Sequence, residues 1–260
     1  MNERNTLRPL RSLDLSSSYS PRSISPRPYN TRSPSPLFRY HPEEEDPIRN
    51  VIDNLLESFP NLQLKCTTNI KIEERLVSSI YDNHEQPSSI YCWLSDNQNT
   101  LQYKILLGFF LLMGIGCEKD EKRAFTLFLL AAKKDYLLAQ EMVADFYFYG
   151  IGTHKEEILA FQWYNKCVKQ ESAYGYYGLG RCYEYGKGTD RFLNKAYECY
   201  RASADRGSVR GMNELGRLYQ DGIGCTKNLD KAMHWYHKAF SHGCEEAQIQ
   251  MNILLEQNHN

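Results

Sequence analysis

Residues 215–239 have the sequence LGRLYQDGIGCTKNLDKAMHWYHKA, and the Gly-x-Gly motif within this stretch occurs three more times upstream. The four motifs begin at Gly114, Gly150, Gly186 and Gly222, so each step is 36 residues. Two further positions keep this step, a small residue and an aromatic residue four positions after it. They are Ala124, Ala160, Ala196 and Ala232, and Phe128, Tyr164, Tyr200 and Tyr236. A fixed period of roughly 20 to 50 residues is typical of a solenoid, so the sequence predicts four stacked repeats.

Each repeat is predicted to be a pair of helices. In repeat four, Met212, Leu215 and Leu218 lie at helical spacing before the glycines, and Ala232 and Tyr236 do so after them. Glycine accepts the left-handed backbone conformation that ends a helix and reverses the chain. The motif therefore predicts the turn between a first and a second helix.

Polar residues and glycines mark the predicted ends of the second helices. Asp120 and Asn228 follow their motifs at the same distance and are placed to cap the helix start, with Glu156 a poorer cap. Gly207 and Gly243 are placed to close the second helices of repeats three and four. Small residues at Gly108, Ala144, Gly180 and Gly216 are expected to let the two helices of a pair approach closely.

The chain closely resembles the SEL-one-like repeat, a relative of the tetratricopeptide repeat, through the pattern Leu215-Gly216-x-Leu218-Tyr219-x-x-Gly222-x-Gly224-x-x-Lys227-Asn228-x-x-Lys231-Ala232-x-x-Trp235-Tyr236-x-Lys238-Ala239. The resemblance covers about residues 101–256 and weakens in repeat three, where Phe192 replaces the usual acidic cap. It implies an all-α fold, a right-handed α-solenoid of antiparallel helix pairs, with repeats at about 101–135, 136–171, 172–207 and 208–243. It also implies a chain that binds other proteins and has no activity of its own.

Residues 1–46 are predicted to be a disordered tail. They hold seven of the ten prolines and nine serines, with few periodic apolar positions. Dispersed arginines suggest either a basic arm for nucleic acid or anionic lipid, or a solvated linker, and we favour the linker because no aromatic residues alternate with them regularly. Four serines precede prolines and are candidate phosphorylation sites for a proline-directed kinase: Ser20, Ser25, Ser33 and Ser35.

Residues 47–100 are predicted to form an N-terminal helical cap. Pro47 suits a first helical position, and an apolar stripe follows at Ile48, Val51, Ile52, Leu55, Leu56 and Phe59. Two more helices are expected near Ile72–Ile80 and Ile90–Leu94, separated by breaks at Pro60 and Pro87. The alternative is that residues 47–59 form a partner-binding or dimerisation helix.

Residues 244–260 are expected to contain a C-terminal capping helix at Glu245–Glu256 and a frayed end. The apolar positions of this helix are Ala247, Ile249, Met251, Ile253 and Leu254.

No motif in the sequence predicts catalysis, a cofactor or a metal. The eight cysteines form no Cys-x-x-Cys pair and are expected to be small buried or half-buried residues in a reducing compartment. His234, His237 and His242 cluster near one helix, but their counterparts in other repeats vary in type, so we expect these histidines to face solvent rather than to bind a metal; the counterparts are Gln162, Asn165, Glu198 and Arg201. The Gly-x-Gly motifs follow no strand and precede no Gly-Lys-Ser/Thr, which argues against phosphate binding.

The first helices are expected to line the concave side of the solenoid and to meet a partner. The 36-residue step aligns three rows: Glu141, Tyr177 and Asn213; Asp145, Arg181 and Arg217; and Phe148, Glu184 and Gln220. Such a mixture of charged, amide and aromatic groups suits a peptide or protein segment, although an ordinary polar face without a ligand is an equal alternative.

Charge and apolar patterning set the remaining expectations. The net charge is −1, which disfavours a duplex nucleic-acid surface. The longest apolar run, Ile105 to Cys117, is too short to span a bilayer, and the first residues lack a signal peptide. We expect a cytoplasmic, non-enzymatic scaffold or adaptor that binds a partner protein, in signalling or as a regulatory subunit and with a kinase acting on or with it. The alternatives are a homodimer through residues 47–59 and an enzyme with a pocket in the groove.

Overall fold

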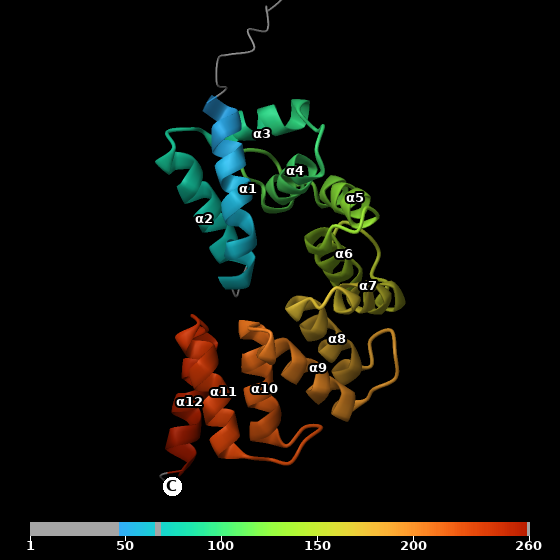
Figure 1. Cartoon of the computed structure of the whole chain (residues 1–260), viewed down its shortest axis with the longest axis vertical. Coiled ribbons are helices and arrows are strands. Elements are labelled where there is room, and N and C mark those ends of the chain that lie inside the picture. Colours follow the sequence, from blue (N-terminus) through green and yellow to red (C-terminus); the bar gives the residue numbers. More distant parts are fainter. Residues whose placement is uncertain (1–46, 66–68, 259–260) are drawn as a thin grey trace, which may run out of the picture. The chain divides into compact units, whose positions relative to one another are not determined.

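The computed structural model describes residues 47–65 and 69–258, and its regular elements within these ranges are all helices (Figure 1). The predicted disordered tail, residues 1–46, lies outside the described residues. Three helices precede the repeats: α1 (Pro47–Lys65), α2 (Asn69–Asp82) and α3 (Pro87–Asp96). The repeats contain α4 (Leu101–Met113), α5 (Glu121–Ala132), α6 (Leu137–Tyr149), α7 (Glu157–Lys169), α8 (Ala173–Tyr185), α9 (Leu193–Asp205), α10 (Val209–Asp221) and α11 (Leu229–Ser241), and α12 (Glu245–Asn258) follows them. From α4 onward each helix packs against the next one in the chain, which is the arrangement of an α-solenoid.

The first glycine of each motif ends the first helix of its repeat. Gly114, Gly150, Gly186 and Gly222 have left-handed φ values of 78°, 77°, 65° and 73°. The amide of Gly150 donates to the carbonyl of Phe146, and the amide of Gly222 donates to that of Leu218. The predicted turn between the two helices of a repeat is confirmed at all four motifs.

The second glycine of motifs two to four packs against the preceding repeat, which the sequence alone did not predict. Gly152, Gly188 and Gly224 also have positive φ, and a Cβ atom on any of them would lie 2.1 Å from a carbonyl oxygen. These oxygens belong to Glu121, Glu157 and Leu193, each at the start of the previous repeat's second helix. We call this the second-glycine contact. Only a residue without a side chain permits so close an approach of two backbones.

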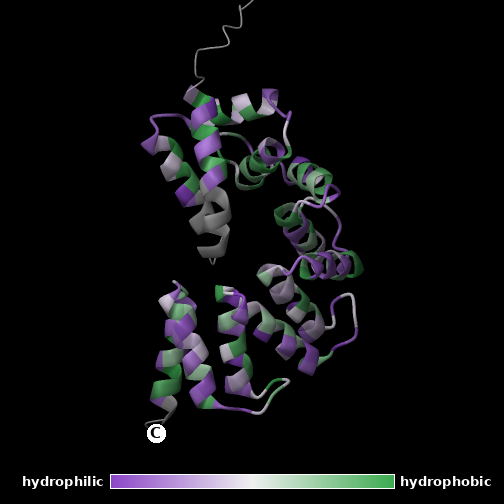
Figure 2. Cartoon of the chain, in the orientation of Figure 1, coloured by the Kyte–Doolittle hydropathy of each residue, from purple (hydrophilic) through white to green (hydrophobic). Residues whose placement is uncertain are grey.

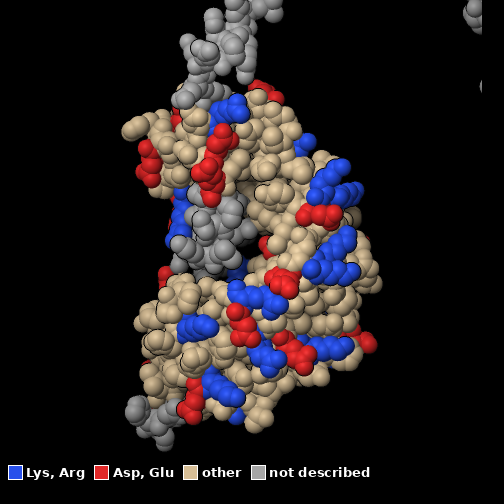
Figure 3. Space-filling model, viewed as in Figure 1, with Lys and Arg blue, Asp and Glu red and all other residues tan. Residues whose placement is uncertain are grey.

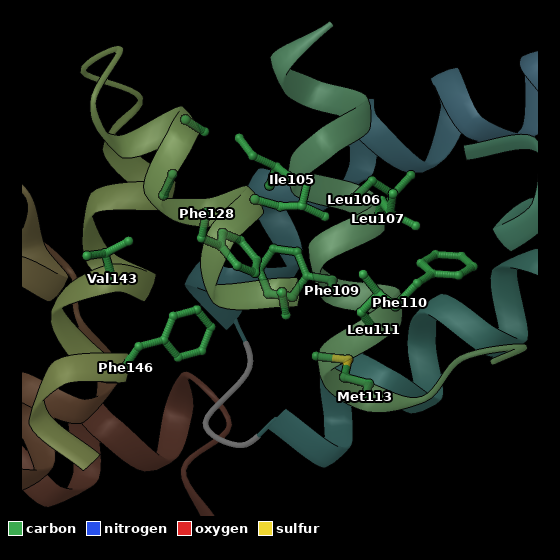
Figure 4. Packing of buried hydrophobic residues seen from close by; sticks show 14 of the residues in the cluster. Ile105, Leu106, Leu107, Phe109, Phe110, Leu111, Met113, Phe128, Val143 and Phe146 are labelled. Carbon is green, nitrogen blue, oxygen red and sulfur yellow. The ribbon is translucent and has the colours of Figure 1, made fainter. Parts of the chain in front are cut away.

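The aromatic row forms the core. At most 1% of the surface of each side chain in this row is exposed: Phe128, Tyr164, Tyr200 and Tyr236. A Cβ atom added to Gly216 would lie 2.8 Å from the ring of Tyr236, so the small residues do allow the close helix approach that we predicted. In repeats one and two, Phe128 stacks edge-on against Phe109 at 4.9 Å and against Phe146 at 5.4 Å (Figure 4). The core is therefore continuous from repeat one to repeat two.

The second helices differ in how they begin. The Asp120 carboxylate accepts a hydrogen bond from the amide of Arg123, and the Asn228 side chain accepts one from that of Lys231, both at 2.9 Å. These two predicted caps are confirmed, whereas Glu156 and Phe192 make no side-chain cap. Figure 2 shows hydrophobic and hydrophilic residues sharing most of these helices, as expected for amphipathic elements.

Helix α1 uses its apolar stripe within the chain. Val51, Ile52 and Leu55 are buried in the same core cluster as repeat one, and the hydroxyl of Tyr103 donates to Asp53 at 3.2 Å. These three positions of the stripe are thus packed within the chain, and the homodimer alternative stays a prediction. The predicted break at Pro60 is wrong, because α1 continues to Lys65. A proline removes one helical hydrogen bond but does not oblige the helix to end there.

Two other sequence expectations need correction. Ile249 and Ile253 of α12 are exposed, because the face that packs is formed by Ala247, Met251 and Leu254 at a spacing of four and three residues. Cys92 is exposed, because Ile90 and Leu94 of α3 turn the opposite face inward. Six other described cysteines are buried or half-buried as predicted, and Cys66 lies outside the described residues.

None of the helices in the described part of the chain combines the length and apolar character needed to cross a membrane.

Candidate functional site

The nine residues predicted to meet a partner lie on the first helices α6, α8 and α10, which we call the first-helix face. Phe148 and Glu184 are buried, and the other seven are half-buried. The face therefore consists of polar and aromatic groups that contact one another while part of their surface stays in solvent.

Tyrosines of the second helices support this face from below. The hydroxyl of Tyr164 donates to Asp145, that of Tyr200 donates to Glu184 at 2.8 Å, and that of Tyr236 donates to Gln220 at 2.7 Å. Each of these buried hydroxyls thus finds an acceptor on the first helix of its own repeat. These three acceptors consequently help to hold the fold.

Asp145 connects repeat two to repeat three. Its second carboxylate oxygen accepts a hydrogen bond from the hydroxyl of Tyr174 on α8 at 2.5 Å. Burial raises the pKa of Asp145, while the hydroxyl donors and the nearby guanidinium groups of Arg210 and Arg181 act to lower it. The carboxylate is therefore surrounded by donors from two repeats.

Glu141 lies one helical turn before Asp145 and has an unusual proton affinity. Ser172, which caps α8, donates its hydroxyl to Glu141 at 2.5 Å. Burial raises the pKa of Glu141 from 4.5 to about 7, with a further contribution from the charge of Asp145. This carboxyl group therefore keeps its proton to a higher pH than an ordinary glutamate.

We expect a Glu141→Gln variant to be more stable than the wild type at pH 8 but not at pH 5. The folded-state pKa lies above the unfolded value, so the wild type loses stability as pH rises from 4.5 through about 7. Glutamine can still accept from Ser172 and avoids this loss, which gives a difference of roughly 2 kcal/mol at pH 8 after allowing for partial exposure.

Urea unfolding at the two pH values measures the difference. The control is Glu198→Gln, because the side chain of Glu198 is exposed. Its stability should equal that of the wild type at both pH values. An equal effect of Glu141→Gln at pH 5 and pH 8 would contradict the raised pKa.

Arg217 is held by two carboxylates. Its Nη2 lies 2.6 Å from Glu184, and its Nε lies 2.8 Å from Glu214 one turn earlier on α10. The side chain of Glu184 is only 5% exposed, so this is a nearly buried charge that depends on its cationic partner.

Arg181 occupies an aromatic environment instead. Its guanidinium lies 4.3 Å from the ring centre of Phe148, 5.1 Å from that of Tyr149 and 5.7 Å from that of Tyr177. It also donates a hydrogen bond to the hydroxyl of Tyr149 at 2.7 Å. Contacts between guanidinium groups and aromatic faces stabilise the cation without neutralising its charge.

Three residues near these arginines were missed by the sequence-based rows. Tyr149 is the last residue of α6, Tyr174 and Arg210 lie near the starts of α8 and α10, and Arg210 lies 5.5 Å from the ring of Tyr174. A signal was present, because Tyr174 and Arg210 are 36 residues apart and Tyr149 is 36 residues before Tyr185. We define the Arg181 cluster as Asp145, Phe148, Tyr149, Tyr174, Tyr177, Arg181 and Arg210.

The histidines predicted to face solvent do so, and two of the cysteines lie in surroundings that keep their thiols protonated. No group of three or more His, Cys, Asp or Glu side chains in them is placed to hold a metal, and His234, His237 and His242 are exposed. Burial raises the pKa of Cys182 and Cys199 to about 12, so their thiols stay protonated at neutral pH and are poor nucleophiles.

A cavity of about 710 Å³ lies beside two glycine loops and contains none of the nine predicted residues. It is lined by Lys119, Asp120, Glu121, Lys122, Gly150, Gly152, Thr153 and His154.

On the face that Figure 3 shows, lysine and arginine side chains are interspersed with aspartate and glutamate, a pattern that does not favour binding of a nucleic-acid backbone.

Phosphorylation of the tail and a kinase partner stay predictions. Ser20, Ser25, Ser33 and Ser35 lie in residues 1–46, outside the described residues, and so does any kinase contact with them.

Two solved bacterial structures have a similar fold. The chain is similar to a protective antigen of uropathogenic Escherichia coli with an SLR fold, at 25% identity and a TM-score of 0.58 over 72% of this chain and 43% of that one. It is also similar to a Sel1 repeat protein of Oxalobacter formigenes, at 23% identity and a TM-score of 0.53 over 65% of this chain and 50% of that one. Helicobacter pylori cysteine-rich protein B matches 48% of this chain over 93% of its own, at 26% identity and a TM-score of 0.40. The chain thus spans half or less of the first two proteins.

A search of curated proteins found no significant match. The Sel1 repeat family model matches residues 104–136, 137–170, 173–208 and 209–244, which agree closely with the four helix pairs. The chain belongs to the Sel1 repeat family.

Proposed function

We propose that this protein is a non-enzymatic scaffold that binds a protein or peptide partner on the first-helix face of repeats two to four. The observation that carries the proposal is the continuous series of half-buried charged, amide and aromatic side chains along α6, α8 and α10. Sel1 repeat proteins generally act as scaffolds for protein interactions, which supports the proposal. Interfaces of this kind take most of their affinity from aromatic and arginine side chains.

Two exposed tyrosines provide the test. Tyr149 and Tyr185 end α6 and α8, and they are 54% and 56% exposed. A double variant, Tyr149→Ser with Tyr185→Ser, should retain at most about a tenth of the partner recovered by the intact protein from its own cells, because buried interface aromatics often contribute more than about 1 kcal/mol each.

The matched control alters exposed apolar residues of the second helices. Ile158 on α7 and Phe240 on α11 are 63% and 38% exposed, and replacing both with serine should leave partner recovery unchanged. Recovery that is lost in the control but kept in the tyrosine variant would move the binding site to the second helices. Failure of the intact protein to retain any partner would overturn the scaffold proposal.

The proposed setting is the cytoplasm, with a role in signalling. Six described cysteines are free thiols, which suits a reducing compartment: Cys92, Cys117, Cys167, Cys182, Cys199 and Cys225. A fluorescently tagged protein should fill the cytoplasm, and mass spectrometry of protein from its own cells should find phosphate on the four Ser-Pro serines. A secreted protein with oxidised cysteines would contradict this setting.

A further inference from the structure

Arg181 and Arg217 occupy the same position in consecutive repeats, but their surroundings differ in charge. Arg217 is bound by Glu184 and Glu214. The residues 36 positions before those two carboxylates are Phe148 and Gly178. The two groups that neutralise Arg217 are therefore replaced by an aromatic ring and a bare backbone at Arg181.

The guanidinium of Arg181 consequently has N–H groups that can donate hydrogen bonds to a ligand. Among the described residues no carboxylate lies within 4.0 Å of it, and the acceptor that it reaches is the hydroxyl of Tyr149. A guanidinium carries five N–H donors in a planar fork. Its Cζ lies over the rings of Phe148, Tyr149 and Tyr177, and the N–H groups that do not donate to Tyr149 are left for a ligand.

A second guanidinium increases the local positive charge. Arg210 lies 5.5 Å from the ring of Tyr174 and 6.0 Å from that of Tyr177, the ring that also faces Arg181. Asp145 is the carboxylate that both arginines influence, and its oxygens already accept from Tyr164 and Tyr174. Arg210 thus places a second cation near Asp145 and Tyr177.

The site is open to a ligand. Arg181 is half-buried, and the ring of Tyr149 beside it is 54% exposed. An arginine edge next to an exposed ring presents one polar and one apolar contact close together. This combination matches an acidic residue with an apolar neighbour in an extended segment.

We infer that Arg181 binds the carboxylate of an Asp or Glu side chain in a linear segment of a partner protein, with an adjoining apolar side chain on the ring of Tyr149. The inference rests on the proposed function and adds the chemistry of the partner. Carboxylate matches the planar guanidinium fork in a bidentate pair. A nucleic-acid backbone would require further cations along the face, where Glu184 and Glu214 lie instead.

Selection from a random 12-residue peptide library tests the inference directly. Peptides retained by the wild type should be enriched in Asp or Glu beside an apolar residue. Replacing that acidic residue with its amide should weaken binding roughly ten- to a hundred-fold, which is the usual range for a charged hydrogen bond. This arm requires no change in the protein and so cannot fail through misfolding.

Protein variants locate the contact. The Arg181→Gln variant should bind the acidic peptide more weakly by the same factor, and its affinity for the amide peptide should equal that of the wild type. Arg206→Gln is the matched control, because Arg206 also lies over a tyrosine, Tyr176 at 4.4 Å, but is exposed at the end of α9. Its affinity for the peptide should not change.

A second pair of variants places a carboxylate on the site itself. Phe148→Glu copies the residue that binds Arg217 in the next repeat and should abolish acidic-peptide binding, whereas Phe148→Gln removes the same ring and should retain most of it. Equal loss in both variants would overturn the inference, as would an Arg181→Gln protein that still selects acidic peptides.

The two proposals fail differently. The wild type could select peptides that are not enriched in acidic residues and that no longer bind the Tyr149→Ser variant. That result would overturn the carboxylate inference and keep the first-helix face as the binding site. Binders insensitive to every first-helix variant would overturn the proposed function.

Discussion

A Gly188→Ala variant is expected to lose about 3 kcal/mol of unfolding free energy. The new methyl group would meet the carbonyl oxygen of Glu157 at 2.1 Å, and alanine would also be strained at a φ of +70°. Since the contact joins repeat three to the start of α7, the loss should appear as weakened stacking between two repeats. Urea unfolding measures the size of the effect, and hydrogen exchange in α7 and α8 locates it.

Gly186 provides the matched control two residues earlier. It has a similar φ of +65°, but the atoms nearest to a Cβ added there would be 3.5 Å away. Gly186→Ala should therefore lose only about 1 kcal/mol, the cost of the left-handed conformation alone. If the two variants were equally stable, backbone proximity at Gly188 would have no energetic consequence.

An Arg217→Met variant is expected to lose about 3 kcal/mol, because it leaves the nearly buried carboxylate of Glu184 without its cation. The hydroxyl of Tyr200 would remain as a donor to Glu184, and the 31% exposure of Arg217 keeps the loss at the lower end of the range for buried pairs. Thermal and urea unfolding should agree on the change.

Two further variants separate charge from packing. Adding Glu184→Gln to Arg217→Met should restore part of the stability, because the amide carries no charge and still accepts from Tyr200. Arg206→Met, at an exposed arginine over Tyr176, should change stability by less than about 0.5 kcal/mol. A double variant as unstable as Arg217→Met would show that the arginine acts through packing.

The fold could be predicted from the sequence because its determinants recur. The turn glycines, the buried aromatic row and the caps at Asp120 and Asn228 each follow from local backbone or packing rules, and the 36-residue step repeats the same signal. Pro60 and Ile249 were misjudged where the signal did not recur. Each occurs once, so a local rule had to decide without the period to correct it.

The contacts of the candidate site could not be predicted in the same way. Register placed Asp145, Arg181 and Arg217 in one row, but each also has a partner in a neighbouring repeat, and that contact depends on side-chain reach. Phe148 and Glu184 illustrate the difference, since both are buried at the same position although one is aromatic and the other acidic. Register fixed their burial, and only the three-dimensional arrangement identified Tyr200 and Arg217 as the partners of the acid.

The second-glycine contact has a consequence for how such a chain can change. It is a contact between two backbones. The carbonyl groups that the glycines contact belong to two acidic residues and one aliphatic residue, Glu121, Glu157 and Leu193. The fit between neighbouring units is therefore independent of the chemistry displayed at that position. Substitutions can therefore give a repeat a new binding surface without changing the distance between its backbone and that of the repeat before it.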